Sequence, residues 1–197
     1  MGHATGPGYG PPQADVAMRI FIALDIPAEV RARLTEYMER ARALAAGARW
    51  ARVEGLHVTL KFVGHVSDAM VEQIKTALAS IKTAPFAVRF EGTGFFPNPK
   101  AARVFWAGMD GGAELPRLAS TIDAALEKLG FERETKPYHP HLTLARTSAR
   151  PLRELQPLLA DTPPQFGTMT AREFFLYQSQ PQKGGSKYTK LERFRLE

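Results

Sequence analysis

The tetrapeptide HVTL, which begins at His57, and the tetrapeptide HLTL, which begins at His141, decide how this chain folds. Both alternate polar and apolar residues, which is the period of a half-buried strand. Because successive strand side chains point to opposite faces, His57 shares a face with Thr59, and His141 shares a face with Thr143. Each tetrapeptide therefore presents an imidazole beside a hydroxyl on an apolar backing. If the two face each other, they form a pocket that can bind a phosphate and move protons on either side of it.

Strand and helix patterns alternate along the rest of the chain. Apolar residues at helical spacing follow Pro27, which suits the first turn of a helix, and Ser67 can cap a second helix. Residues 91–100 are rich in Gly and Pro, which is typical of a loop or a bulged strand. We expect helices over residues 27–46, 67–82, 113–129 and 151–160, and strands over residues 19–26, 50–53, 57–64, 86–90, 104–109, 169–178 and 188–196, the last two as a C-terminal hairpin.

These elements give strand–helix–strand units twice. Nearly half of the folded chain separates the two motif histidines, which suggests an internal duplication with one motif in each lobe. We expect an α+β fold that is bilobal, with two mainly antiparallel sheets related by a pseudo-twofold duplication, helices outside and the active-site cleft between the lobes. Residues 18–197 would form this single domain. Residues 1–17, rich in Gly, Pro and Ala, would be a flexible leader, since they lack the pattern of a secretory signal.

The composition is that of a soluble globular protein with one core. The chain has 197 residues, of which 44% are hydrophobic and 23% charged, and no apolar run is long enough to span a membrane. The absence of cysteine excludes disulfides, thiolate metal sites and cysteine nucleophiles. A net charge of +6 fits either an ordinary basic surface or an anionic partner such as nucleic acid. Charge alone does not separate these interpretations, so the site must.

Several other chemistries lack the residues they need. Zinc normally takes three or four ligands, and the chain has no HExxH motif, no CxxC motif and no acidic cluster near either tetrapeptide. His139 and His141 offer half of a metal site without a clear third ligand, so we expect no metal. We interpret His139 and His65 as surface or supporting residues. No P-loop and no GxSxG elbow occurs, so neither nucleoside triphosphates nor a serine nucleophile is indicated.

Acid–base catalysis remains. The reference pKa of histidine is about 6.5, so near neutral pH one imidazole of a pair can take a proton from water while the other gives a proton to a leaving oxygen. His57 and His141 are the candidates for these transfers. Thr59 and Thr143 can hydrogen-bond the non-bridging phosphate oxygens. Arg146 can either offer its guanidinium to developing negative charge or form an exposed salt bridge.

Further side chains are candidates for RNA contacts. Lys61 has the strand phase of Thr59 and can meet a phosphate, although a solvated lysine at a strand end is an equally good interpretation. Trp50, Phe95 and Phe96 can stack on bases, although aromatic residues in a protein of this size are more often in the core. A basic track along an RNA strand would comprise Lys100, Arg103, Arg133 and Lys136.

The chain resembles the two-histidine (2H) phosphoesterase superfamily, whose mark is a repeated His-x-Thr/Ser motif. It is most similar to the bacterial and archaeal branch called RNA 2′,3′-cyclic phosphodiesterase, also named 2′-5′ RNA ligase. The resemblance covers about residues 18–197. It rests on RIFIALDIP at 19–27, LHVTLKFVG at 56–64, GFFPNP at 94–99, PHLTLAR at 140–146 and YTKLERF at 188–194.

The resemblance implies a bilobal fold with a central cleft, no cofactor, no required metal, and hydrolysis of an RNA 2′,3′-cyclic phosphate end to a 2′-phosphate. On that pattern His57 matches the proton donor to the departing 3′ oxygen, and His141 matches the base that activates water. Thr59 and Thr143 match the hydroxyls that hold the phosphate, and Arg146 matches a basic residue after the second motif. It further implies a cytoplasmic monomer acting on RNA ends, tRNA fragments among them.

Two alternatives stay open. Some members of the superfamily join RNA ends, such as tRNA halves, through a 2′-5′ bond without ATP, which is the reverse reaction with a 5′-hydroxyl in place of water. One site serves both directions, so the sequence does not rank them. An RNA-end binding protein without turnover would account equally well for the basic charge, but it would have no need of two proton carriers.

Overall fold

The computed structural model describes residues 17–148, 152–159, 162–183 and 185–197. The expected leader lies, apart from Ala17, outside the described residues. The elements are β1 (Met18–Leu24), α1 (Ala28–Leu44), β2 (Arg49–Trp50), the 3₁₀ helix η1 (Val53–Gly55), β3 (Val58–Val66), α2 (Asp68–Ala79), β4 (Phe86–Phe96), η2 (Pro99–Ala101), β5 (Val104–Asp110), α3 (Glu114–Glu127), β6 (His141–Arg146), η3 (Arg153–Leu158), β7 (Gln165–Ala171), β8 (Glu173–Gln182) and β9 (Gly185–Arg195).

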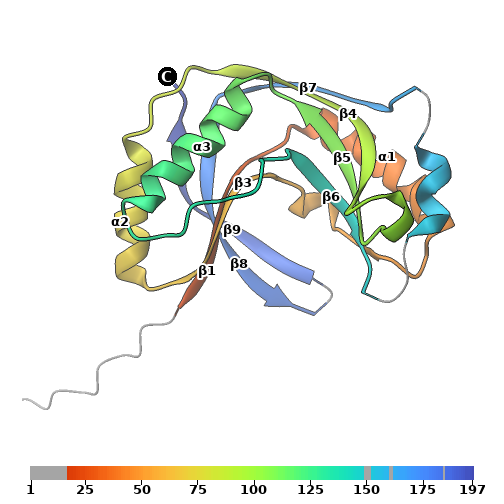
Figure 1. The fold of residues 1–197 in the computed structure, drawn as a ribbon, viewed down its shortest axis with the longest axis horizontal. Coiled ribbons are helices and arrows are strands. Elements are labelled where there is room, and N and C mark those ends of the chain that lie inside the picture. The colour runs from red at the N-terminus through yellow and green to blue at the C-terminus, as the bar shows by residue number, and fades with distance from the viewer. Residues whose placement is uncertain (1–16, 149–151, 160–161, 184) are drawn as a thin grey trace, which may run out of the picture.

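The strands form two antiparallel sheets, which confirms the expected α+β, two-lobed fold (Figure 1). One sheet has the order β3-β1-β8-β9 and the other β2-β6-β5-β4-β7. The first order repeats in the second as β6-β5-β4-β7, with β2 added at the edge. In both halves a strand, a helix and the motif strand follow one another, and the motif strand pairs antiparallel with the strand before the helix. This repeat is the duplication that the spacing of the motifs indicated.

Strand β1 is buried on both of its faces, which explains its unbroken apolar run. One face, with Ile20 and Ile22, belongs to the main core that both sheets share. The other face, with Phe21 and Ala23, forms a small separate cluster together with Phe175 and Tyr177 of β8. Since Ala23 lies opposite Thr59 in the β1–β3 ladder, this second face of the sheet is also the one that carries Thr59.

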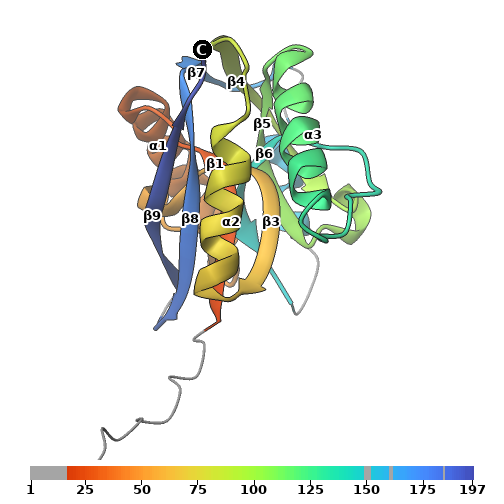
Figure 2. The ribbon, with the colours of Figure 1, turned by 90° about the vertical axis from the view of Figure 1, so that its left-hand side faces the viewer.

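In each half, the helix that follows the first strand of the repeat packs against the sheet of the other half. Helix α1 follows β1 but packs on β7 of the other sheet, where the Tyr37 ring lies 5.2 Å from Phe166 and 6.4 Å from Phe105. Helix α3 follows β5 but contacts β3 and α2, beside which it lies in Figure 2. The hydroxyl of Ser67 caps α2 by accepting from the Met70 amide, as its position in the sequence indicated. This exchange of helices joins the two lobes over one continuous core.

The structure corrects three expected elements. The strand expected over residues 169–178 is two strands, β7 and β8, which part at Arg172 and enter different sheets. The helix expected over residues 151–160 is η3, a 3₁₀ helix that contains Pro157, a residue without the N–H that an α-helix needs. The strand expected over residues 50–53 is only β2, after which the chain turns into η1. Among the described residues, no helix is long and apolar enough to cross a membrane.

Candidate active site

The two motif strands meet although they belong to different sheets. Strands β3 and β6 are in contact at the centre of the molecule (Figure 1). The Tyr138 hydroxyl, three residues before His141, donates to the Thr59 carbonyl oxygen at 2.9 Å. The approach to the second motif is therefore tied directly to the first motif, and the strands of the two tetrapeptides lie in contact.

Both motif imidazoles are oriented by the same device. Nδ1 of His57 lies 2.7 Å from the Gly55 carbonyl oxygen, and Nδ1 of His141 lies 2.7 Å from the His139 carbonyl oxygen. A carbonyl oxygen only accepts, so Nδ1 carries the proton in each neutral ring. Each Nε2 then bears a lone pair and can take or return a proton. The backbone thus gives both rings the tautomer that a general base requires.

Three aromatic rings surround the His57 ring. Centroid distances to it are 4.5 Å for Phe21, 5.0 Å for Tyr188, which meets it edge-on, and 6.1 Å for Tyr177. Burial among these rings lowers the pKa of His57 to about 4, although the carbonyl of Gly55 opposes the shift. In the free protein the ring is therefore neutral at pH 7.

Asp25 is the acidic group that acts on His57, but its charge is compensated. Arg31 lies 3.1 Å from Oδ1 of Asp25, and Lys190 lies 2.7 Å from its Oδ2. Asp25 raises the pKa of His57, and Arg31 lowers it. These opposing charges leave burial as the dominant influence on the imidazole.

The second imidazole has a different neighbourhood. The Phe96 ring meets His141 edge-on with 5.0 Å between centroids, and it lies 6.4 Å from His139. Burial lowers the pKa of His141, and the charges of Arg146 and His139 lower it further, against the carbonyl of His139. The main-chain frames of the two rings match, but the side chains around them do not.

A bulge in β6 brings Arg146 to the motif face. Strict alternation would point Arg146 away from Thr143, because three positions separate them. In the ladder with β5, however, Ala145 pairs with Phe105 and Thr143 with Trp106, so an extra residue is inserted in β6. Nη2 of Arg146 consequently donates to Oγ1 of Thr143 at 3.3 Å. The guanidinium and the hydroxyl are therefore grouped as phosphate binding would require.

Sequence reasoning missed the aromatic residues around the motifs, Phe21, Tyr177, Tyr188 and Trp106. Trp106 lies opposite Thr143, and its indole covers Gly94, where an added Cβ would come within 2.2 Å of the ring. The family resemblance gave a signal for two of them, because RIFIALDIP contains Phe21 and YTKLERF contains Tyr188, whereas Tyr177 and Trp106 lie outside the quoted motifs.

Two expected RNA contacts lie elsewhere. The Lys61 ammonium binds the Asp123 carboxylate and the Glu132 carbonyl oxygen, and only 11% of the Lys61 side chain is exposed. The Trp50 indole N–H donates to the Ala45 carbonyl oxygen at 3.1 Å, so the ring packs under the end of α1. Both side chains therefore have structural partners, which favours the structural interpretation of each.

The remaining candidates divide by strand phase. Phe95 lies in the main core, whereas its neighbour Phe96 is half-buried beside His141.

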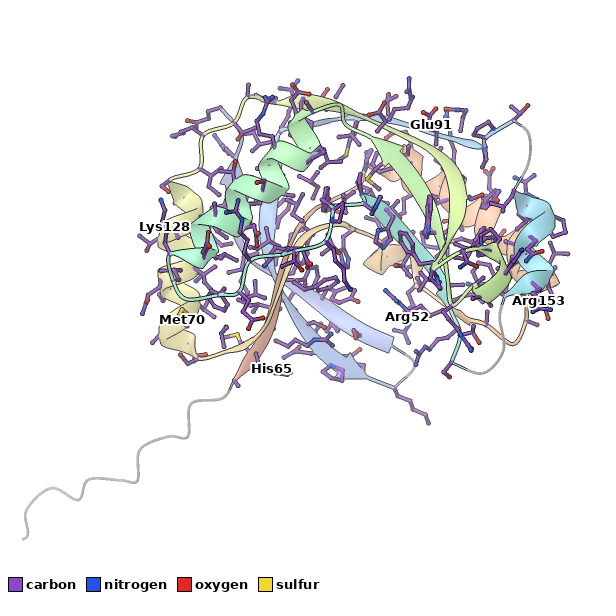
Figure 3. The ribbon with its side chains drawn as sticks, in the orientation of Figure 1. Arg52, His65, Met70, Glu91, Lys128 and Arg153 are labelled. Carbon is purple, nitrogen blue, oxygen red and sulfur yellow. The ribbon has the colours of Figure 1, made fainter. Side chains whose placement is uncertain are left out.

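Arg133 of the expected basic track forms ion pairs with Glu127 and Asp123 on α3. His65 lies at the end of β3 beside the start of β1 (Figure 3). In the part of the chain that the structure describes, no three His, Asp or Glu residues gather as a metal site would need.

The fold and the paired His-x-Thr strands define the class of two-histidine phosphoesterases. More narrowly, the chain belongs to the LigT-like phosphoesterase family, whose model matches residues 24–106 and 109–188. It is 34% identical over 182 residues to an RNA 2′,3′-cyclic phosphodiesterase of Archaeoglobus fulgidus, covering 90% of this chain and 99% of the relative.

Solved structures give the same assignment. A crystal structure of a Thermus thermophilus protein matches with a TM-score of 0.78 and 32% identity over 91% of this chain and 98% of the other. Escherichia coli LigT complexed with 3′-AMP matches with a TM-score of 0.75 and 28% identity over the same shares of the two chains. Both matches extend across the two sheets, so the likeness is one of the whole fold.

Proposed function

We infer that this protein hydrolyses RNA 2′,3′-cyclic phosphate ends to 2′-phosphates. The observation that carries the proposal is the pair of imidazoles at the starts of β3 and β6, each with Nδ1 bound to a carbonyl two residues earlier and Nε2 left for proton transfer. Relatives that carry the name RNA 2′,3′-cyclic phosphodiesterase support the substrate, and they favour hydrolysis over 2′-5′ ligation.

The proposed reaction uses one imidazole on each side of the phosphorus. Nε2 of His141 takes a proton from water as the water oxygen forms a bond to phosphorus. The bond from phosphorus to the 3′ oxygen breaks, and His57 gives that oxygen a proton. The products are a 2′-phosphate and a 3′-hydroxyl, and a proton passed from His141 back to His57 through solvent restores the starting state.

The phosphate would be held by Thr59, Thr143 and Arg146. Thr59 lies on the β1–β3 face and Thr143 on the β5–β6 face, so the two hydroxyls approach from the two sheets. Arg146 already donates to the Thr143 hydroxyl, which places its positive charge beside that side of the site. Preorganised donors of this kind act on the charge that develops on the non-bridging oxygens.

Because the pKa values of both imidazoles are lowered, the protonation of the imidazole that acts as the acid needs an explanation. Burial leaves both rings with a pKa below 6.5 in the free protein, so neither is ready to donate at neutral pH. A bound cyclic phosphate carries a negative charge, and an opposite charge next to an imidazole raises its pKa. We propose that the substrate anion thereby brings His57 into the range in which it can be protonated.

The RNA chain would extend from this phosphate over Phe96, whose half-buried ring lies beside His141 and can stack on a base. The net charge of +6 favours an anionic polymer. We further propose that tRNA fragments are among the substrates and that the protein acts as a monomer.

The test is an RNA oligonucleotide with a 2′,3′-cyclic phosphate end, incubated with the protein and EDTA. We expect conversion to a 2′-phosphate. A phosphatase specific for 3′-phosphates distinguishes this product, because it leaves the 2′-phosphate in place and removes a 3′-phosphate. The same oligonucleotide with a plain 3′-phosphate serves as the control and should stay unchanged. Persistence of the cyclic end at high protein concentration would overturn the proposal, and a 2′-5′-joined product with 5′-hydroxyl RNA would instead favour ligation.

A further inference from the structure

We propose that Lys61, Asp123 and Tyr138 form a clasp that fixes the second motif relative to the first. They act as positioning residues for the reaction. This inference rests on the proposed function and extends it to residues outside the reacting site. The clasp connects β3, which carries the first motif, with the segment of residues 131–140, which leads from α3 into His141.

The first part of the clasp is a buried ion pair. The Lys61 ammonium meets the Asp123 carboxylate of α3, and the two side chains are only 11% and 10% exposed. Burial raises the pKa of Asp123, but Lys61, the Glu134 amide and Arg133 outweigh this and hold that pKa below its usual value. The carboxylate is therefore charged, and a buried charge of this kind holds its partner in one geometry.

The second part of the clasp anchors the 131–140 segment at three points. Lys61 Nζ donates to the Glu132 carbonyl oxygen at 2.9 Å, and the Glu134 amide donates to Oδ2 of Asp123 at 3.0 Å. Further along, the Tyr138 hydroxyl donates to the Thr59 carbonyl oxygen at 2.9 Å. Every one of these bonds ends on β3 or on the carboxylate that β3 holds.

These hydrogen bonds matter because the segment of residues 131–140 does not pair with a strand. Residues 131–140 lie in neither helix nor strand, yet His139 at their end supplies the carbonyl that orients the His141 ring. The bonds to β3 and the start of β6 together hold the segment that carries this carbonyl. Lys61 and Thr59 are two residues apart on β3, so the clasp is anchored on the strand that carries the first motif.

Displacement of a reacting group by about 1 Å can cost about 10²-fold in rate, so a loosened clasp should act on turnover. Tyr138→Phe deletes one hydroxyl and keeps the ring. We expect kcat on the cyclic substrate to fall by about 10- to 100-fold with KM little changed, in a variant that still unfolds cooperatively. Wild-type kcat, KM and pH profile in the folded variant would overturn the role of Tyr138.

The ion pair is tested by replacing both partners, because one alone would leave a buried unpaired charge. The variant Lys61→Met/Asp123→Val removes both charges and puts apolar side chains of similar size in their place, and such replacements are often neutral for stability. We expect it to fold and to lose kcat in the same range as Tyr138→Phe, while Lys82→Met, which breaks the exposed Lys82–Glu197 pair, retains wild-type kcat. A folded double variant with wild-type kcat would contradict the clasp, and Tyr138→Phe decides the matter if the double variant does not fold.

A second readout separates the clasp from the proposed function. Inorganic phosphate is titrated into protein labelled with ¹⁵N in its histidine rings, and the His57 and His141 signals are followed. If both rings respond over one concentration range in the wild type and the His141 response weakens in Tyr138→Phe, the clasp is supported even where no RNA substrate turns over. Equal responses of both rings in the variant would overturn the clasp and leave the hydrolysis assay to judge the reaction.

Discussion

The two halves of the site have the same main-chain frame and different surroundings. His57 and His141 each follow a strand–helix unit, and each binds through Nδ1 to a carbonyl two residues earlier. Around His57 stand rings from β1, β8 and β9, whereas His141 has Phe96 on one side and the charge of Arg146 nearby. The two halves thus share the placement of the imidazoles, whereas the side chains around each ring give it its own proton affinity.

This difference indicates how a symmetric frame can run an asymmetric reaction. A hydrolysis needs one proton acceptor and one proton donor, and identical environments would titrate together without preference. The aromatic wall lowers the pKa of His57 to about 4, so its proton depends most on a bound anion. A donor that is charged only when the phosphate is present fits the role that we propose for His57.

The largest effect should come from removing either imidazole. We expect His57→Ala and His141→Ala each to lower kcat/KM by about 10²–10⁴-fold, because each deletes one proton transfer. The double variant should lose little more than the worse single one, since the two act as a unit. Initial rates on the cyclic-phosphate oligonucleotide measure all three.

His65→Ala is the matched control, because His65 lies at the other end of the same strand as the first motif. It should retain wild-type kinetics. Full activity in either motif variant would show that the acid–base assignment is wrong, whatever the control does.

The motifs could be predicted from the sequence because strand alternation is local. His57 and Thr59, and likewise His141 and Thr143, are two residues apart, so their shared face follows from the period alone. The contact between β3 and β6 agrees with the expected duplication, which puts one motif in each half. The same short-range pattern therefore predicts both the two strands and the side chains that we propose for the site.

Alternation does not predict bulges, partners from distant elements or the pairing between strands, and these features decided where the other candidates lie. By alternation Lys61 would share a face with Thr59, but a register shift in the ladder with β1 puts Lys61 opposite Ile22, on the core face, where it binds Asp123 of α3. Arg146 reaches the motif face only because of the bulge in β6, which no residue type announces. Trp50 and Phe95 lie on one side of the five-stranded sheet and Phe96 lies on the other. The pairing between strands determines these sides.

The second effect concerns the charge of Arg146, which lies in the His141 half. Arg146→Ala should lower kcat by about 10²-fold, because loss of one preorganised donor to developing phosphate charge typically costs that much or more. Arg146→Lys should recover part of it, since a point charge remains without the planar fork. Arg153→Ala, in η3, is the control of equal charge change. A loss confined to KM would indicate that Arg146 binds the substrate without aiding the transition state.

The third effect is on the pH dependence. Activity of the free protein needs one protonated and one neutral ring, and this state is most populated between the two pKa values of the pair. Because burial lowers both below 6.5, kcat/KM should peak below pH 6.5 and fall on either side. The profile of kcat should lie at higher pH, because bound phosphate raises the same pKa values. A kcat/KM maximum above pH 7.5 would contradict the lowered values.

The smallest effect sharpens the comparison most, because it changes each half without touching an imidazole. Tyr188→Leu opens the wall beside His57 to water, so the pKa of His57 should rise from about 4 toward 6.5 while that of His141 stays. Phe96→Leu should do the converse, raising the pKa of His141 alone. Ring-¹⁵N titrations of both variants report the two histidines separately. If either substitution moved both rings equally, the halves would be coupled through the site, and their proton affinities would belong to the pair rather than to each ring's own aromatic neighbours.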